Sequence, residues 1–213
     1  MKTKVVIFVL AGVALLFSLF YFFGSRSYTA QHPTLSVQAD LPDIHLKHVK
    51  YYAEDHRYNR GIFHLDRAIA AIRNIERDVD SESGALLELA ITKLDEIHKE
   101  LVLDSLKTKD LYDAFDYTLS TLARAELEVS EMYAETNQRD LAKLAMKHAQ
   151  LHLKNALLFE DSMWYGDSLH LEVEKKVYAE LDSLIDNEAI SPTDLTLRID
   201  DIIKEMNQLL ENR

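Results

Sequence analysis

The sequence predicts an all-α protein, in which an N-terminal transmembrane helix is followed by a soluble multi-helix bundle or an array of helical hairpins. Three observations predict it. The 213 residues include only 5 glycines and 3 prolines, and no proline lies between Asp43 and Ser191. Downstream of residue 40, apolar residues recur every three or four positions, which is the period of an amphipathic helix. Residues 5–23 carry no charged side chain.

The uncharged segment has the length of a membrane span. At about 1.5 Å per residue, a helix over residues 5–23 nearly crosses a hydrocarbon core of about 30 Å. Lys2 and Lys4 precede it, so positive-inside bias places the N-terminus in the cytoplasm and the body outside. We therefore expect residues 1–24 to be a single-pass signal-anchor, with the body in a bacterial periplasm. The alternative is a cleaved signal peptide, whose apolar region is usually shorter, about 7–15 residues.

The rest of the chain divides at polar breaks. Residues 25–40 are polar, contain one proline and predict a linker, and residues 41–213 predict one helical domain. Pro42 and Pro192 suit the first turn of a helix, and Ser191 precedes Pro192 as a capping residue. The expected helices are 42–79, with a break near 56–61, then 83–106, 110–136, 139–160, 164–187 and 192–212.

Composition excludes several classes of function. There is no cysteine, so disulfides, thiolate metal sites and thiol nucleophiles are excluded. The 36 acidic residues against 24 basic ones give a net charge of −12, which argues against nucleic-acid binding. No Gly-x-Ser-x-Gly or phosphate-binding glycine loop is present. The sequence therefore predicts no enzymatic activity and no cofactor.

One tripeptide, Tyr-Ala-Glu, occurs three times, beginning at Tyr52, Tyr133 and Tyr178. After the first two, small residues stand at positions +9 and +16. These are Gly61, Ala68, Ala142 and Ala149. A tyrosine, a polar turn and two small residues at this spacing predict a helix hairpin with closely packed helices.

The segment 123–156 resembles a tetratricopeptide hairpin. Tyr133 matches the tyrosine of the family's first helix, and Asn137 matches its turn glycine. The segment departs from the family at Glu126 and Lys154, which replace its tryptophan-type residue and its closing proline. The resemblance implies stacked hairpins that bind a peptide or a partner protein in a groove. Tyr52, Tyr133 and Tyr178 are then the expected repeat or partner-contact positions.

Histidines are the other candidates for a site. His148 and His152 have the i, i+4 spacing of a metal-binding pair on a helix. His45 and His48 form a second pair, at i, i+3. This pair is interpreted either as part of a polar pocket or pH-responsive contact, or as the end of a helix that extends beyond the bundle. All four could instead be ordinary half-buried polar residues.

Two functions follow from these observations. The favoured one is a membrane-anchored extracytoplasmic protein that binds another protein, as an adaptor or as an accessory subunit of an envelope complex. The alternative is a helical bundle that binds a metal or a small ligand through its histidines, with His148 and His152 as the ligands.

Overall fold

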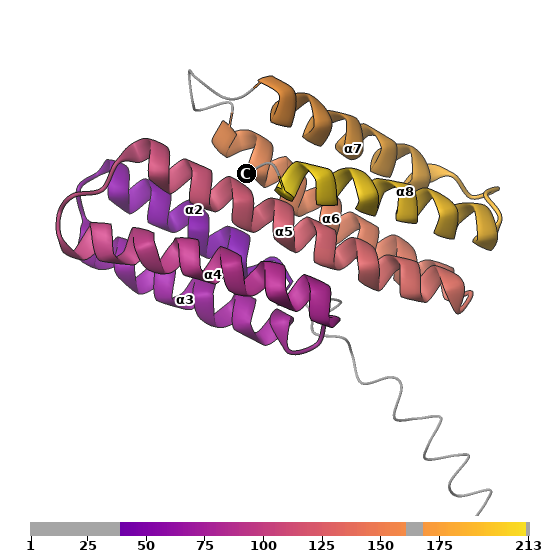
Figure 1. Cartoon of the computed structure of the whole chain (residues 1–213), viewed down its shortest axis with the longest axis horizontal. Coiled ribbons are helices and arrows are strands. Elements are labelled where there is room, and N and C mark those ends of the chain that lie inside the picture. The colour runs from indigo at the N-terminus through magenta and orange to yellow at the C-terminus, as the bar shows by residue number, and fades with distance from the viewer. Residues whose placement is uncertain (1–38, 161–167, 212–213) are drawn as a thin grey trace, which may run out of the picture. The chain divides into compact units, whose positions relative to one another are not determined.

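The computed structural model describes residues 39–160 and 168–211, and these form seven α-helices with no strand (Figure 1). The helices are α2 (Leu41–Glu54), α3 (Tyr58–Glu76), α4 (Ser81–Val102), α5 (Thr108–Glu135), α6 (Arg139–Glu160), α7 (Ser168–Asp186) and α8 (Pro192–Glu211). The all-α prediction is confirmed. The break predicted near residues 56–61 lies at residues 55–57, so the expected segment 42–79 forms the two helices α2 and α3.

The predicted transmembrane helix and its linker lie outside the described residues, apart from the last two positions of the linker. None of the helices in the described part is both long and apolar enough to cross a membrane. The signal-anchor therefore stays a prediction.

Helix α5 is the central element of the described body. It packs on α4, α6 and α8 (Figure 1) and also touches α2. Polar as well as apolar side chains of α5 are buried, including Asp116, Ser120, Arg124 and Glu126. An amphipathic pattern that predicts one buried face therefore understates how much of this helix is covered.

Two large apolar cores lie along α5, beside a small cluster of Ala90, Tyr117 and Leu210. The first is built from α2, α3, α4 and the N-terminal half of α5, around Leu65, Ile91 and Phe115. The second is built from the C-terminal half of α5 with α6, α7 and α8, around Met146 and Ile199. Helix α6 contributes to both cores, so the boundary between them crosses α5 and α6.

The two Tyr-Ala-Glu hairpins share one turn geometry. The amide of Arg57 donates to the carbonyl of Tyr52 at 2.8 Å, and the amide of Gln138 donates to that of Tyr133 at 2.8 Å. His56 and Asn137 have φ of 52° and 57°. This is the Schellman ending, in which a left-handed residue lets the last carbonyls of a helix be satisfied.

The small residues after each turn are buried as the hairpin spacing predicts. Gly61, Ala68, Ala142 and Ala149 all lie against a neighbouring helix. A Cβ at Gly61 would come within 3.9 Å of the Cβ of Tyr52, so the start of α3 approaches the end of α2 closely. The third triplet, at Tyr178, lies within α7 and ends no helix.

Side-chain caps fix the starts of α4 and α8. Asp80 caps α4 by accepting hydrogen bonds from the amides of Glu82 and Ser83. Ser191 Oγ accepts from the amide of Asp194 at 3.1 Å and donates to the Asp194 carboxylate at 2.6 Å. Ser191 therefore caps α8, with Asp194 as the acid at the third helical position, and this cap fixes the start of α8 as the sequence predicts.

Candidate metal centre

Three histidines meet on the α2–α3 hairpin. His45 and His48 lie one turn apart on α2, and His64 lies on α3. Each has a ring nitrogen within 4.8 Å of those of the other two. The Nδ1 atoms of His45 and His64 are 3.1 Å apart, and the ring centroids of His48 and His64 are 4.5 Å apart.

The turn after α2 explains why these residues meet. Gly61 of α3 lies against Tyr52 of α2. Residue 64 is one helical turn after Gly61, and residue 48 is one helical turn before Tyr52, so these two residues also lie side by side. The i, i+3 spacing then adds His45 to the same side. His64 is held in place by aromatic neighbours, since its ring stacks on Tyr52 with centroids 5.5 Å apart and meets the edge of Phe63.

The electrostatic setting favours neutral imidazoles. Partial burial lowers the pKa of His45, and the neighbouring charges of His48 and Arg67 lower it further. Burial also lowers the pKa of His64, with added contributions from His48 and His45. Neutral imidazole is the form that binds a metal ion. The shifts therefore keep two of the three candidate ligands available below the usual pKa of histidine.

The separation of one pair of nitrogens matches a tetrahedral transition-metal site. Two nitrogens bound to one ion at about 2.05 Å in tetrahedral geometry lie about 3.3 Å apart, close to the 3.1 Å between His45 and His64. His48 is exposed, so an ion can reach the group from solvent. Three imidazoles with no carboxylate suit zinc, copper or nickel in preference to magnesium or calcium.

The sequence-predicted pair His148 and His152 lies elsewhere, on α6. His152 is fully buried, and its Nδ1 is 2.6 Å from Oδ2 of Asp43. His148 is half-buried, with Nδ1 3.9 Å from Oε2 of Glu126. Each imidazole thus faces a different carboxylate, and neither belongs to the three-histidine group. Metal binding by this pair stays a prediction.

These α6 histidines belong to a buried polar cluster at the boundary of the two cores. Asp43 reaches it from α2 and also accepts a 2.5 Å hydrogen bond from Nδ2 of Asn155. Glu126 of α5 is 1% exposed, and neither of its oxygens has a hydrogen-bond partner among the described residues. Burial, with repulsion from Asp43, raises the pKa of Glu126 well above its ordinary value.

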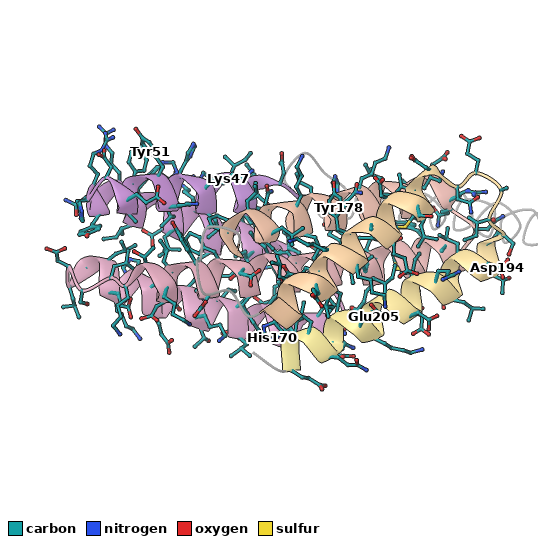
Figure 2. All side chains as sticks on the ribbon, turned by 90° about the horizontal axis from the view of Figure 1, so that it is seen from above. Lys47, Tyr51, His170, Tyr178, Asp194 and Glu205 are labelled. Atoms are coloured by element: carbon teal, nitrogen blue, oxygen red, sulfur yellow. The ribbon has the colours of Figure 1, made fainter. Side chains whose placement is uncertain are left out.

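The three tyrosines predicted as contact positions are only partly accessible. Tyr133 is 7% exposed and packs in the second core. Tyr52 is half-buried against His64, and Tyr178 is half-buried on α7 (Figure 2). Tyr133 and Tyr178 both pack with the second core, whereas Tyr52 stacks on His64 of the α2–α3 hairpin, so the structure does not bring all three together.

His64 is the residue that sequence reasoning missed. The pair His45 and His48 is visible as a helical spacing, but His64 follows His48 by 16 positions across a turn. The hairpin spacing carried the signal: if Gly61 packs against Tyr52, residue 64 must lie beside residue 48. Combining the repeated tripeptide with the histidine positions would have found the group.

Comparison of the chain with protein-family models, with curated proteins and with solved structures finds no match. The fold and the site define the class: an all-α helical bundle with a three-histidine group on its α2–α3 hairpin.

Proposed function

We propose that the helical body binds one divalent transition-metal ion through His45, His48 and His64. The observation that supports this proposal is the convergence of three imidazoles from two helices, with ligand nitrogens within 4.8 Å of one another. The lowered pKa values of His45 and His64 add support, because protons then compete less with the metal.

Metal analysis of the untagged full chain tests this proposal. We expect one zinc, copper or nickel ion per chain after equilibration and desalting. His64→Ala should lower the affinity by on the order of a hundredfold or more, because it removes a ligand. His98→Ala is the matched control, since His98 lies on α4 outside the group.

The α6 pair provides the competing outcome. His148→Ala should leave metal binding unchanged if the three-histidine group is the site. Loss of the metal in His148→Ala but not in His64→Ala would overturn the proposal in favour of the pair on α6. If neither zinc nor copper nor nickel binds stoichiometrically, both the three-histidine site and the α6 pair are overturned as metal sites.

Protein binding is the second proposed function, favoured by exposed aromatic side chains on the same hairpin. Tyr51 of α2 is 56% exposed (Figure 2) and Phe63 of α3 is 55% exposed. Accessible aromatic side chains are typical of interaction surfaces. In this proposal the protein is an adaptor or accessory subunit of an envelope complex.

Co-purification in mild detergent tests the second function. Tyr51→Ala with Phe63→Ala should lose a partner that Leu197→Ala retains, because Leu197 is equally exposed but lies on α8. Recovery of the unaltered protein as a lone monomer across conditions would contradict it.

We also propose that residues 5–23 anchor this body in a membrane, on the side opposite the cytoplasm. A C-terminal reporter that is active only outside the cytoplasm should be active, and the mature protein should keep its N-terminal segment. A mature N-terminus between Tyr28 and Gln31 would instead identify the segment as a cleaved signal peptide.

A further inference from the structure

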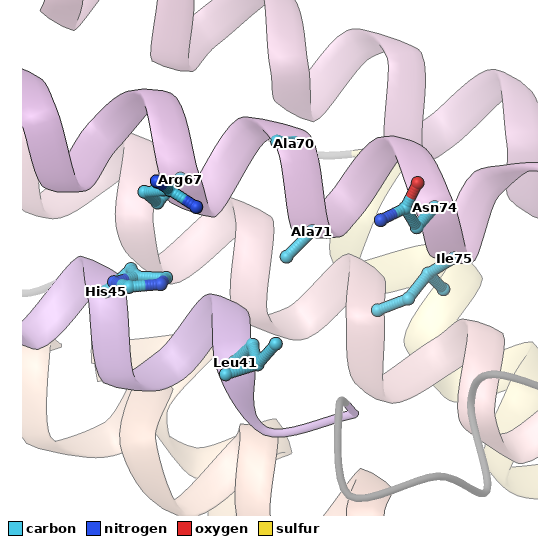
Figure 3. Close-up of a pocket in the computed structure, with 7 residues that line it drawn as sticks. All are labelled: Leu41, His45, Arg67, Ala70, Ala71, Asn74 and Ile75. Carbon is cyan, nitrogen blue, oxygen red and sulfur yellow. The ribbon is translucent and has the colours of Figure 1, made fainter.

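A small pocket lies between α2 and α3, beside the histidine group. Its volume is about 150 Å³, and Figure 3 shows its lining. His45 and Arg67 lie at one end, and Asn74 lies at the other. A cavity of about this size can hold a molecule with about six heavy atoms.

Small side chains create the space. Ala70 and Ala71 contribute only methyl groups to the pocket, at positions where larger residues would fill the gap between the helices. Leu41 and Ile75 add apolar surface. The pocket therefore combines a short apolar lining with polar side chains at both ends.

Arg67 has no ion-pair partner among the described residues, although the chain is strongly acidic. Arg57 and Arg198 pair with Asp55 and Glu180, whereas Arg67 is an exposed cation without an ion pair in the described part, as are Arg60, Arg73 and Arg77. The Arg67 guanidinium lies over the ring of Phe63, with its Cζ atom 5.4 Å from the ring centroid. The exposed side-chain amide of Asn74 likewise makes no hydrogen bond within the described part of the chain. A cation and an amide without protein partners thus face one cavity.

We infer that this pocket binds a small monocarboxylate. The planar guanidinium of Arg67 matches a carboxylate with two parallel hydrogen bonds. Ala70, Ala71, Leu41 and Ile75 accommodate a short alkyl group, whose far end approaches Asn74 at the opposite end of the pocket. The volume limits the ligand to a few carbon atoms.

The pocket and the proposed metal site share His45, which links the two. A divalent ion bound to His45 adds positive charge beside the pocket and strengthens carboxylate binding there. The linkage rests on the proposed metal function. The pocket itself does not, because Arg67 and Asn74 are outside the histidine group.

Propionate is the probe, titrated into the ¹⁵N-labelled full chain and followed by the amide signals of Ala71 and Asn74. We expect saturable shifts at these amides, and none with propionamide, which has the same shape but no charge. Arg67→Gln should weaken binding by up to about fivefold, because an ion pair at an exposed arginine contributes up to about 1 kcal/mol. Arg73→Gln removes the same charge from an exposed position on α3 outside the pocket and should change affinity less than about twofold.

Two further arms complete the test. Ala71→Met fills the pocket without removing a charge and should abolish the shift at Asn74 while circular dichroism stays unchanged. Titration with and without zinc separates the two proposals. Propionate binding without binding of zinc, copper or nickel supports the pocket and overturns the metal function, whereas metal binding without propionate binding does the reverse. Equal weakening by Arg67→Gln and Arg73→Gln would overturn the pocket as a specific site.

Discussion

Oδ2 of Asp43 lies 2.6 Å from Nδ1 of His152, although the two residues are 109 positions apart. Asp43 is in the first turn of α2, and His152 is on α6. Both side chains are almost fully buried, at 2% and 0% exposure. Since α2 also carries His45 and His48, this contact fixes the position of two candidate metal ligands relative to the bundle.

Loss of the Asp43 carboxylate should strongly destabilise the protein. Asp43→Ala leaves His152 and Asn155 buried without their shared acceptor. Breaking a buried pair on one side costs about 3–5 kcal/mol, measurable as a lower free energy of unfolding in urea. Asp78→Asn, at an exposed position, is the control and should lie within about 0.5 kcal/mol of the parent. A loss below about 1 kcal/mol for Asp43→Ala would contradict the buried contact.

The same contact should make stability depend on acidity. Burial alone raises the pKa of Asp43, but the charge and hydrogen bond of His152, with the bond from Asn155, outweigh it and the pKa falls below its ordinary value. A carboxyl with a lowered folded-state pKa stabilises above its unfolded pKa, near 4. That contribution is lost as the pH falls through the lower folded value. Urea unfolding from pH 6 to pH 2 should show this loss for the parent protein and not for Asp43→Asn.

Glu126 should have the opposite effect on the pH profile. Its folded-state pKa is raised, first by burial and then by Asp43, while His148 is the other titratable group beside it. As the pH rises above the unfolded-state pKa, Glu126 ionises in the unfolded chain but stays protonated in the folded protein. The free energy of unfolding therefore declines. Glu126→Gln should remove this decline and be the more stable protein at pH 8. Parallel pH profiles for the two proteins would refute the prediction.

Arg124 should be essential to the junction of α4, α5 and α8. It is 1% exposed, its Nη1 donates to Ser83 Oγ at 2.7 Å, and it also pairs with Glu128 and Asn207. Arg124→Ala removes the shared donor from several buried or half-buried acceptors and should cost about 3–5 kcal/mol. Arg198→Ala, at an exposed ion pair, should cost less than about 1 kcal/mol. Equal melting temperatures for the two variants would contradict this role.

Metal retention should extend to mildly acidic pH. A free imidazole is half protonated near pH 6.5, but burial and neighbouring charges lower the pKa of His45 and of His64. Protonation of these ligands, and with it loss of the metal, should therefore occur below that pH. Zinc content measured after dialysis from pH 7.5 to 5 tests this. Complete loss of zinc at or above pH 6.5 would show that the ligands titrate as exposed histidines.

Much of the fold was predictable because it depends on local signals. Periodic apolar residues, Asp80, Ser191 and the polar breaks determine where most helices begin and end, and these are properties of short segments. The hairpin spacing around Tyr52 and Tyr133 also fixed how two helix pairs fold back. A break in the first expected helix was predicted near residues 56–61, and the turn lies at residues 55–57, where it contains neither glycine nor proline and uses His56 in the left-handed region.

The sequence by itself determined the helices, the hairpins and the list of histidines. Only the tertiary structure decided which histidines lie together, because His45, His48 and His64 converge through a turn whereas His148 and His152 point to different carboxylates. It also decided that Asp43 and Glu126 are buried. A polar residue on an amphipathic helix has no local signal for burial, since its exposure depends on which other helices cover that face. The three-histidine site therefore depends on how distant segments pack together, and residue type alone does not identify it.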